Sequence, residues 1–212
     1  GSSWYYLRFI DSQNDSTFAN GELEKKWIPV DFYVGGAEHA TRHLIYARFW
    51  HKFLYDIGVI HSEEPFKKLQ TVGLIMAEDG RKMSKRWGNV VNPDDVINEF
   101  GADTLRIYEM FMGPFDGSVA WSTSSIRGVR RFLDRVWGLQ SKIDDEANND
   151  VVINKLIKKV VDEVIAFKFN TAIAAMMTAL NDVEGKGIST SDYKKFIIAL
   201  APFAPHMCEE LW

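Results

Sequence analysis

The stretch VDFYVGGAEHATRHLIYARFW, Val30–Trp50, contains the transition that decides the fold. A short apolar run ends at Gly35 and Gly36, and the residues that follow have helical periodicity. The apolar positions that recur at helical spacing are Ile45, Phe49 and Phe53. Two other short runs, WYYLRF at residues 4–9 and LQTVGLIM at residues 69–76, are also expected to be extended. Short strands that alternate with a long helix predict a parallel sheet of the α/β class.

The second half of the chain has a helical pattern throughout. In NPDDVINEFG, Asn92 is expected to cap a helix that starts with Pro93 and ends at Gly101. Further helices are predicted over residues 126–143, 153–167, 169–183 and 191–200, with a solvated polar loop over 144–150. One of these helices has an apolar stripe made of Ile153, Leu156, Ile157, Val160, Val161 and Val164. The sequence therefore predicts an α/β part followed by an all-α bundle.

Composition limits the classes of protein that fit this chain. Its 212 residues are 46% hydrophobic and carry a net charge of −4, so a nucleic acid would have to be held by local basic patches. The single cysteine, Cys208, excludes an internal disulfide or a cysteine-based zinc site and is expected to be buried. The aromatic residues, including the seven tryptophans, are interpreted mainly as core and helix-packing residues. No apolar run is long enough for a membrane span, and a cytoplasmic protein is expected.

The ends of the sequence suggest a piece of something larger. There is no initiator methionine, and PHMCEELW at the end stops inside a helical pattern without a capping signal. We expect an excised segment of a longer protein.

The segment MAEDGRKMSKRWGNVVNP, Met76–Pro93, gathers four cationic side chains behind an Asp-Gly turn. Lys82 and Lys85 flank Met83 and Ser84, so two point charges can reach a polyanion from one loop. Mobile lysines of this kind can stabilise charge that develops on phosphate oxygens in a transition state. The alternative is an ordinary solvated charged loop, which the letters RKMSKR taken alone favour.

A second candidate site follows the strand that ends at Gly36. Glu38 and His39 are expected in the first turn of the helix, where a carboxylate can accept from ribose hydroxyls and an imidazole can contact a small ligand. The alternative is that Glu38 complements the helix dipole and that His39 is a capping residue. His39 and His43 are four residues apart, but no glutamate and no third ligand accompanies them, so no metal is expected.

A basic helix face provides a third feature. In IRGVRRFLDRVW the arginines gather on one side, opposite to an apolar face. The arginines of this face are Arg127, Arg130, Arg131 and Arg135. We interpret the face as free for a nucleic-acid backbone, although ordinary hydration of a surface helix explains it equally well.

The order and spacing of GGAEHA and KMSK resemble the second half of the catalytic domain of class I aminoacyl-tRNA synthetases, and most closely the leucine branch. The resemblance covers nearly the whole chain and includes SSWYYLRF, KMSKRWGNVVNPDDVINEFGADTLRIYEMFMGPFD, RFLDRVWGL and PFAPHMCEELW. GGAEHA together with GADTLRIYEMFMGP is similar to the leucine enzymes rather than to their isoleucine, valine or methionine relatives.

The resemblance implies roles for individual residues. Lys82, Met83, Ser84 and Lys85 match the first four positions of the KMSKS loop, which holds the ATP phosphates and stabilises the activation transition state. Gly36, Glu38 and His39 match the segment that lines the adenosine and leucine pocket, with Gly36 and Glu38 on the ATP side. The chain departs from the usual pattern at Arg86, where the family has serine, and at Trp87. The implied partners are ATP with Mg²⁺, leucine and tRNA(Leu), in a monomeric parent protein.

The same resemblance implies a division of the chain. Residues 1–91 would form the second half of a Rossmann-like catalytic domain, 92–125 a stem-contact connection and 126–212 a truncated anticodon-binding bundle. None of the five histidines lies in the family's His-x-Gly-His signature, so the chain alone is expected to be inactive. The alternatives are a non-catalytic tRNA-binding module, an isoleucyl, valyl or methionyl enzyme, and an unrelated nucleotide or metal hydrolase, which the missing Walker lysine context disfavours.

Overall fold

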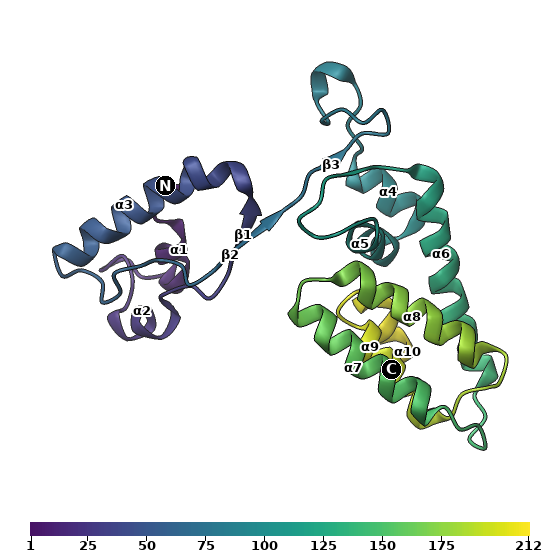
Figure 1. Ribbon diagram of the computed structural model, residues 1–212. Coiled ribbons are helices and arrows are strands. Elements are labelled where there is room, and N and C mark those ends of the chain that lie inside the picture. The colour runs from purple at the N-terminus through teal and green to yellow at the C-terminus, as the bar shows by residue number, and fades with distance from the viewer. The chain divides into compact units, whose positions relative to one another are not determined.

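The computed structural model describes residues 1–212 and divides them into two compact units, residues 1–72 and 73–212 (Figure 1). The first unit combines a parallel strand pair with the helices α1 (Tyr5–Arg8), α2 (Gly21–Trp27) and α3 (His43–Asp56), and the second is mainly helical. The predicted class, an α/β part followed by an all-α bundle, is confirmed. No helix in the chain has the length and the apolar character that a membrane crossing requires.

The strand pair of the first unit has the predicted parallel arrangement. Strand β1 (Tyr33–Gly36) pairs in register with β2 (Leu69–Val72), so that Tyr33 lies opposite Leu69. A 3₁₀-helix, η2 (Ala37–Thr41), and helix α3 (His43–Asp56) form the connection between the two strands. Parallel neighbours need a long crossover, and here a helix provides it.

The predicted helix α3 is confirmed, but the apolar positions that recur along it are not its buried ones. Ile45, Phe49 and Phe53 are 55%, 74% and 45% exposed, whereas the buried residues of the helix are Ala47 and His51. The His51 ring lies 2.9 Å from the Tyr6 hydroxyl through Nδ1 and 2.9 Å from the Ser62 carbonyl through Nε2. Ala47, a small residue, and His51, whose ring is hydrogen-bonded, therefore face the core. A search for large apolar residues at helical spacing detects neither of them.

The run WYYLRF is not a strand. It forms the short helix α1 (Tyr5–Arg8), followed by a 3₁₀ turn, η1 (Phe9–Asp11). The Arg8 guanidinium donates to five carbonyl oxygens of the segment that follows, including Ser12 and Asn14 at 2.8 Å each. The chain must fold back directly after Arg8 to supply these acceptors, and an extended conformation cannot place them around one side chain.

The run LQTVGLIM forms two strands rather than one. Strand β2 ends at Val72, and β3 (Ile75–Met76) pairs in parallel with β4 (Val119–Ala120) in the second unit. Between them the Gly73 amide donates to the Phe115 carbonyl at 2.9 Å. A Cβ atom at Gly73 would lie 1.8 Å from the Gly117 carbonyl oxygen, so only glycine allows this approach.

Seven helices make up most of the second unit. They are α4 (Pro93–Phe100), α5 (Ala102–Phe111), α6 (Thr123–Gly138), α7 (Asp150–Ile165), α8 (Phe169–Glu184), α9 (Thr190–Leu200) and α10 (Pro205–Leu211). A 3₁₀ turn, η4 (Leu139–Lys142), extends α6. The predicted caps are confirmed, because the Asn92 side chain accepts from the Asp94 amide at 3.2 Å and Gly101 has φ = 91°. Helix α7 packs against α8 and α9.

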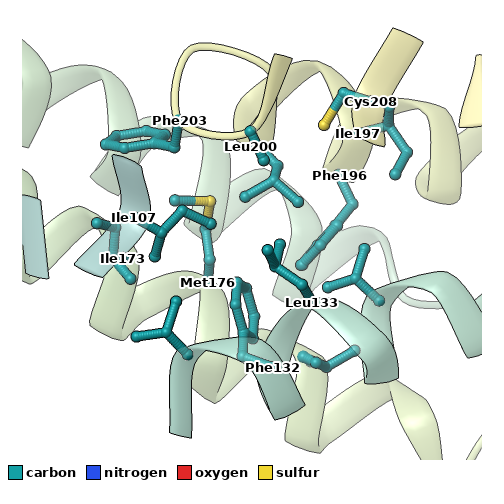
Figure 2. Close-up of a cluster of buried hydrophobic side chains, with 14 of the residues drawn as sticks. Ile107, Phe132, Leu133, Ile173, Met176, Phe196, Ile197, Leu200, Phe203 and Cys208 are labelled. Atoms are coloured by element: carbon teal, nitrogen blue, oxygen red, sulfur yellow. The ribbon is translucent and has the colours of Figure 1, made fainter. Parts of the chain in front are cut away.

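Figure 2 shows part of the core of this unit, which helices α5, α6, α8, α9 and α10 share. Its labelled residues are Ile107, Phe132, Leu133, Ile173, Met176, Phe196, Ile197, Leu200, Phe203 and Cys208. The predicted burial of Cys208 is confirmed, and burial raises the pKa of its thiol to about 12. Most of the predicted α7 stripe is covered, but Val161 is 50% exposed.

The part of the interpretation that placed the tryptophans in the core is wrong for most of them. Trp121 alone is fully buried, whereas Trp27, Trp50, Trp87, Trp137 and Trp212 are exposed and Trp4 is half-buried. Helical spacing identifies a residue's face but not whether another element covers that face.

Asp103 joins α5 to the N-terminus of α10. The buried carboxylate accepts from the backbone amides of Met207 at 2.6 Å and His206 at 3.4 Å. Because Asp103→Ala would leave these amides without their acceptor, we expect it to lower the free energy of unfolding by about 1–3 kcal/mol. Urea denaturation followed by circular dichroism measures this, with Asp94→Ala, an exposed residue of α4, as the control. Equal denaturation midpoints for the two variants would contradict the assigned role of Asp103.

Candidate nucleotide-binding site

The candidate basic loop begins as a tight hairpin after β3. Met76 and Lys82 form an antiparallel bridge, and the Ala77 amide donates to the Arg81 carbonyl at 2.8 Å. Gly80 has φ = 74°, a left-handed conformation that glycine adopts without strain. Asp79 accepts from the Arg81 guanidinium at 2.6 and 2.8 Å, and this hydrogen bond is the main reason why the pKa of Asp79 lies below its ordinary value.

The KMSK segment then forms a defined turn. Ser84 caps a 3₁₀-helix, η3 (Lys85–Trp87), by accepting from the Arg86 amide at 3.2 Å. Asn89 lies across the turn, where its Oδ1 accepts from the Ser84 amide at 2.8 Å and its Nδ2 donates to the Lys82 carbonyl at 3.5 Å. The sequence reasoning missed this role of Asn89, although a Gly-Asn pair is a common turn signal.

The cationic side chains of the loop differ in whether an ion-pair partner neutralises them. Arg81 is paired with Asp79, whereas Lys82 and Lys85 are exposed and have no ion-pair partner. Met83 is half-buried and packs against the core of the helical unit, so the backbone between the two lysines is anchored. Two unneutralised ammonium groups on an anchored turn are suited to binding an anion with several oxygens, such as a polyphosphate.

The second group of predicted residues surrounds the end of β1. Glu38 and His39 lie in η2 rather than in the first turn of an α-helix, because Arg42, at φ −130° and ψ −100°, interrupts the helical backbone before α3. The exposed Glu38 carboxylate folds back over Gly36, and a Cβ atom there would lie 2.2 Å from its Oε2. A side chain at position 36 would therefore displace the carboxylate that we predicted to contact a ligand.

Two tyrosine rings lie beside one of the neighbouring imidazoles. The ring of His43 lies 5.6 Å from that of Tyr33 and 5.7 Å from that of Tyr5, between centroids. Burial, with a smaller contribution from His39, lowers the pKa of His43 below its ordinary value and so favours the neutral ring. His39 Nδ1 and His43 Nε2 are buried without a hydrogen-bond partner. Sequence reasoning missed Tyr5 and Tyr33, because their contacts with His43 join three separate elements.

The two histidines do not belong to a larger cluster of metal-ligating side chains. Their ring centroids are 6.3 Å apart with the planes at 82°. The chain contains no group of three or more His, Cys, Asp or Glu side chains placed to hold a metal ion. The two groups of candidate residues lie in different units: Gly36, Glu38 and His39 in residues 1–72, and the KMSK turn in residues 73–212.

The arginine face of α6 is only partly available. Arg135 donates to Glu184 and Asn181, and Arg130 to Asp134 and the Phe100 carbonyl. Two of the four arginines therefore already have acceptors within the chain, and contact of this face with a nucleic-acid backbone stays a prediction. Arg127 and Arg131 are exposed and have no ion-pair partner.

Two family models match the chain. Residues 9–122 match tRNA synthetases class I (I, L, M and V), and residues 151–212 match the anticodon-binding domain of tRNA ligase. The first match covers more than half of the chain and includes both groups of candidate residues.

Solved structures agree with these matches. A crystal structure of a LeuRS–tRNA–LeuAMS ternary complex from Agrobacterium radiobacter K84 is 37% identical with a TM-score of 0.90, over 100% of this chain and 30% of that one. Methionyl-tRNA synthetase of Mycobacterium tuberculosis bound by methionyl-adenylate is 18% identical with a TM-score of 0.64, over 97% of this chain and 46% of that one. The second likeness concerns the fold alone. The chain spans about a third of the first structure and about half of the second, and it belongs to the class I tRNA synthetases of the isoleucine, leucine, methionine and valine group.

Proposed function

We propose that this chain is part of a leucine–tRNA ligase, which activates leucine with ATP to leucyl-adenylate and transfers the leucyl group to tRNA(Leu). The observation that carries the proposal is the pair of unneutralised lysines, Lys82 and Lys85, on an anchored turn whose sequence is similar to the KMSKS loop of the family. The similarity to the Agrobacterium LeuRS over the whole chain supports leucine as the amino acid.

In the proposed reaction the leucine carboxylate attacks the α-phosphorus of ATP, and the bond to pyrophosphate breaks. Negative charge then accumulates on the departing pyrophosphate. Mg²⁺ would enter the site bound to ATP. Lys82 and Lys85 stabilise this charge, so their contribution is greater in the transition state than in the ground state. Their lack of carboxylate partners leaves both ammonium groups available for it.

The first unit supplies the other proposed contacts. Glu38, held over Gly36, accepts from the ribose hydroxyls, and His39, whose buried Nδ1 lacks a partner, contacts the adenylate and leucine. Residues 1–91 then belong to the catalytic domain, 92–125 to the stem-contact connection and 126–212 to the anticodon-binding bundle. The exposed Arg127 and Arg131 contact the tRNA backbone.

Amino-acid specificity tests the proposal. The longer protein that contains these residues is expected to exchange pyrophosphate into ATP with leucine far faster than with isoleucine, valine or methionine. A hydrophobic pocket separates side chains by only about 1–3 kcal/mol per methylene, so a low rate with the other three is expected. A preference for one of those three would reassign the substrate. No exchange with any of the four would favour the non-catalytic tRNA-binding alternative.

A further inference from the structure

An exposed tryptophan lies at the end of the KMSK turn. Trp87 is 55% exposed, and the Arg81 guanidinium carbon lies 4.9 Å from the centroid of its ring. Positions 81 and 87 directly bracket the segment that contains both lysines, so this contact connects the two ends of the turn. An arginine at this distance from an aromatic ring is within the range of a cation–π interaction.

The Arg81 side chain is held in place from its other side. Asp79 accepts from Arg81 through three donors, the backbone amide at 2.9 Å, Nε at 2.8 Å and Nη2 at 2.6 Å. The hairpin bond between Ala77 and Arg81 fixes the backbone at the same point. Because these bonds already hold the Arg81 side chain, its contact with the Trp87 ring costs little additional side-chain entropy.

A second arginine, Arg86, also contacts the Trp87 ring and can be compared with Arg81. The guanidinium carbon of Arg86 also lies near the Trp87 ring, 5.3 Å from its centroid. Arg86 is the immediate neighbour of Trp87, so that contact does not constrain the rest of the turn. Arg81 is six residues away, and its contact closes the chain around Lys82 and Lys85. The two arginines have the same charge and the same aromatic partner, but only one of them closes the turn.

We propose that Arg81 and Trp87 form a clasp that holds the KMSK turn closed, and that Trp87 is thereby a positioning residue for Lys82 and Lys85. The clasp is separate from the two hydrogen bonds of the Asn89 side chain, which link it to Ser84 and Lys82 within the turn. The catalytic part of this inference rests on the proposed function. Its structural part, the closure of the turn, stands independently of it.

The clasp has a specific kinetic consequence. Opening the turn does not remove either lysine, so ATP is still attracted to the loop and its KM changes little. The lysines instead spend less time where charge accumulates on pyrophosphate, which lowers kcat. An exposed cation–π contact corresponds to about a two- to fivefold change in an equilibrium, so we expect Trp87→Ala to lower kcat by about that factor.

Amide hydrogen exchange on the 212-residue chain tests the closure without any assay of activity. Trp87→Ala and Arg81→Ala are expected to accelerate exchange across residues 82–89 by about two- to fivefold, and Trp87→Phe, which keeps a ring, to accelerate it less. Arg86→Ala removes the same charge but only the local contact, and is expected to change exchange least. Equal exchange in Trp87→Ala and the parent, or an equal effect of Arg81→Ala and Arg86→Ala, would overturn the clasp.

Leucine-dependent pyrophosphate exchange by the longer protein tests the catalytic part. The expected result is a lower kcat with a nearly unchanged KM for ATP in Trp87→Ala, largely restored in Trp87→Phe. If Lys85→Ala is impaired while Trp87→Ala is not, the positioning role is wrong and the proposed function stands. If Lys85→Ala retains the parental rate, the proposed function is wrong, and hydrogen exchange still decides whether the clasp exists.

Discussion

Replacing Lys85 by alanine in the longer protein is expected to lower the rate of leucyl-adenylate formation by about 10²–10³, the usual scale for losing one preorganised charge-stabilising group. Lys85 has no carboxylate partner, and its neighbours Met83 and Ser84 are anchored by packing and by the Asn89 bond. The group is therefore available when charge moves onto pyrophosphate. Leucine binding is expected to change much less, because the proposed contact is made with phosphate oxygens.

Single-turnover measurement of adenylate formation checks this expectation. Lys82→Ala is expected to act in the same direction with a smaller effect. Lys186→Ala provides a matched control, because Lys186 is also exposed and lacks an ion-pair partner but lies between α8 and α9. If Lys82→Ala and Lys85→Ala both activate leucine at the parental rate, the loop is an ordinary solvated turn, as its charge pattern alone would suggest.

The 212 residues by themselves are expected to show no leucine activation, although they contain the KMSK turn. Adenylate formation requires groups on both sides of one α-phosphate, and their positioning contributes about 7–11 kcal/mol in well-oriented reactions. The His-x-Gly-His signature of the class does not occur in this sequence. ATP is expected to bind in about the millimolar range at best, because a few exposed charge contacts are individually weak.

The experiment is a pyrophosphate-exchange assay on the purified chain with leucine and Mg²⁺. A parallel reaction contains the same chain mixed with a separately produced polypeptide that carries the His-x-Gly-His half. Turnover in the mixture alone would support the assignment of these residues to one half of the site. Turnover by the chain alone that disappears in Lys85→Ala, which excludes a contaminating enzyme, would show that the catalytic apparatus has been misplaced.

Local signals in the sequence were sufficient for much of the helical unit. The cap at Asn92, the end of α4 at Gly101 and the helices α6 to α9 follow from turn chemistry and apolar spacing within about one element. The parallel pairing of β1 and β2 followed from their alternation with a long helix. The motifs GGAEHA and KMSK were also found from the sequence, because residue types and their order are sufficient to identify them.

The tertiary structure alone decided which surfaces are covered and which charges remain available. Ala47 and His51 face the core in place of Phe49, since distant groups on Tyr6 and Ser62 satisfy the imidazole. Arg135 is neutralised by Glu184, 49 positions away, whereas Lys85 remains without a partner. Periodicity reports the side of an element on which a residue lies, but burial and hydrogen bonding depend on groups that come from elsewhere in the chain. For the same reason the contact between Arg81 and Trp87 cannot be predicted from their spacing in the sequence, because it depends on how the turn between them folds.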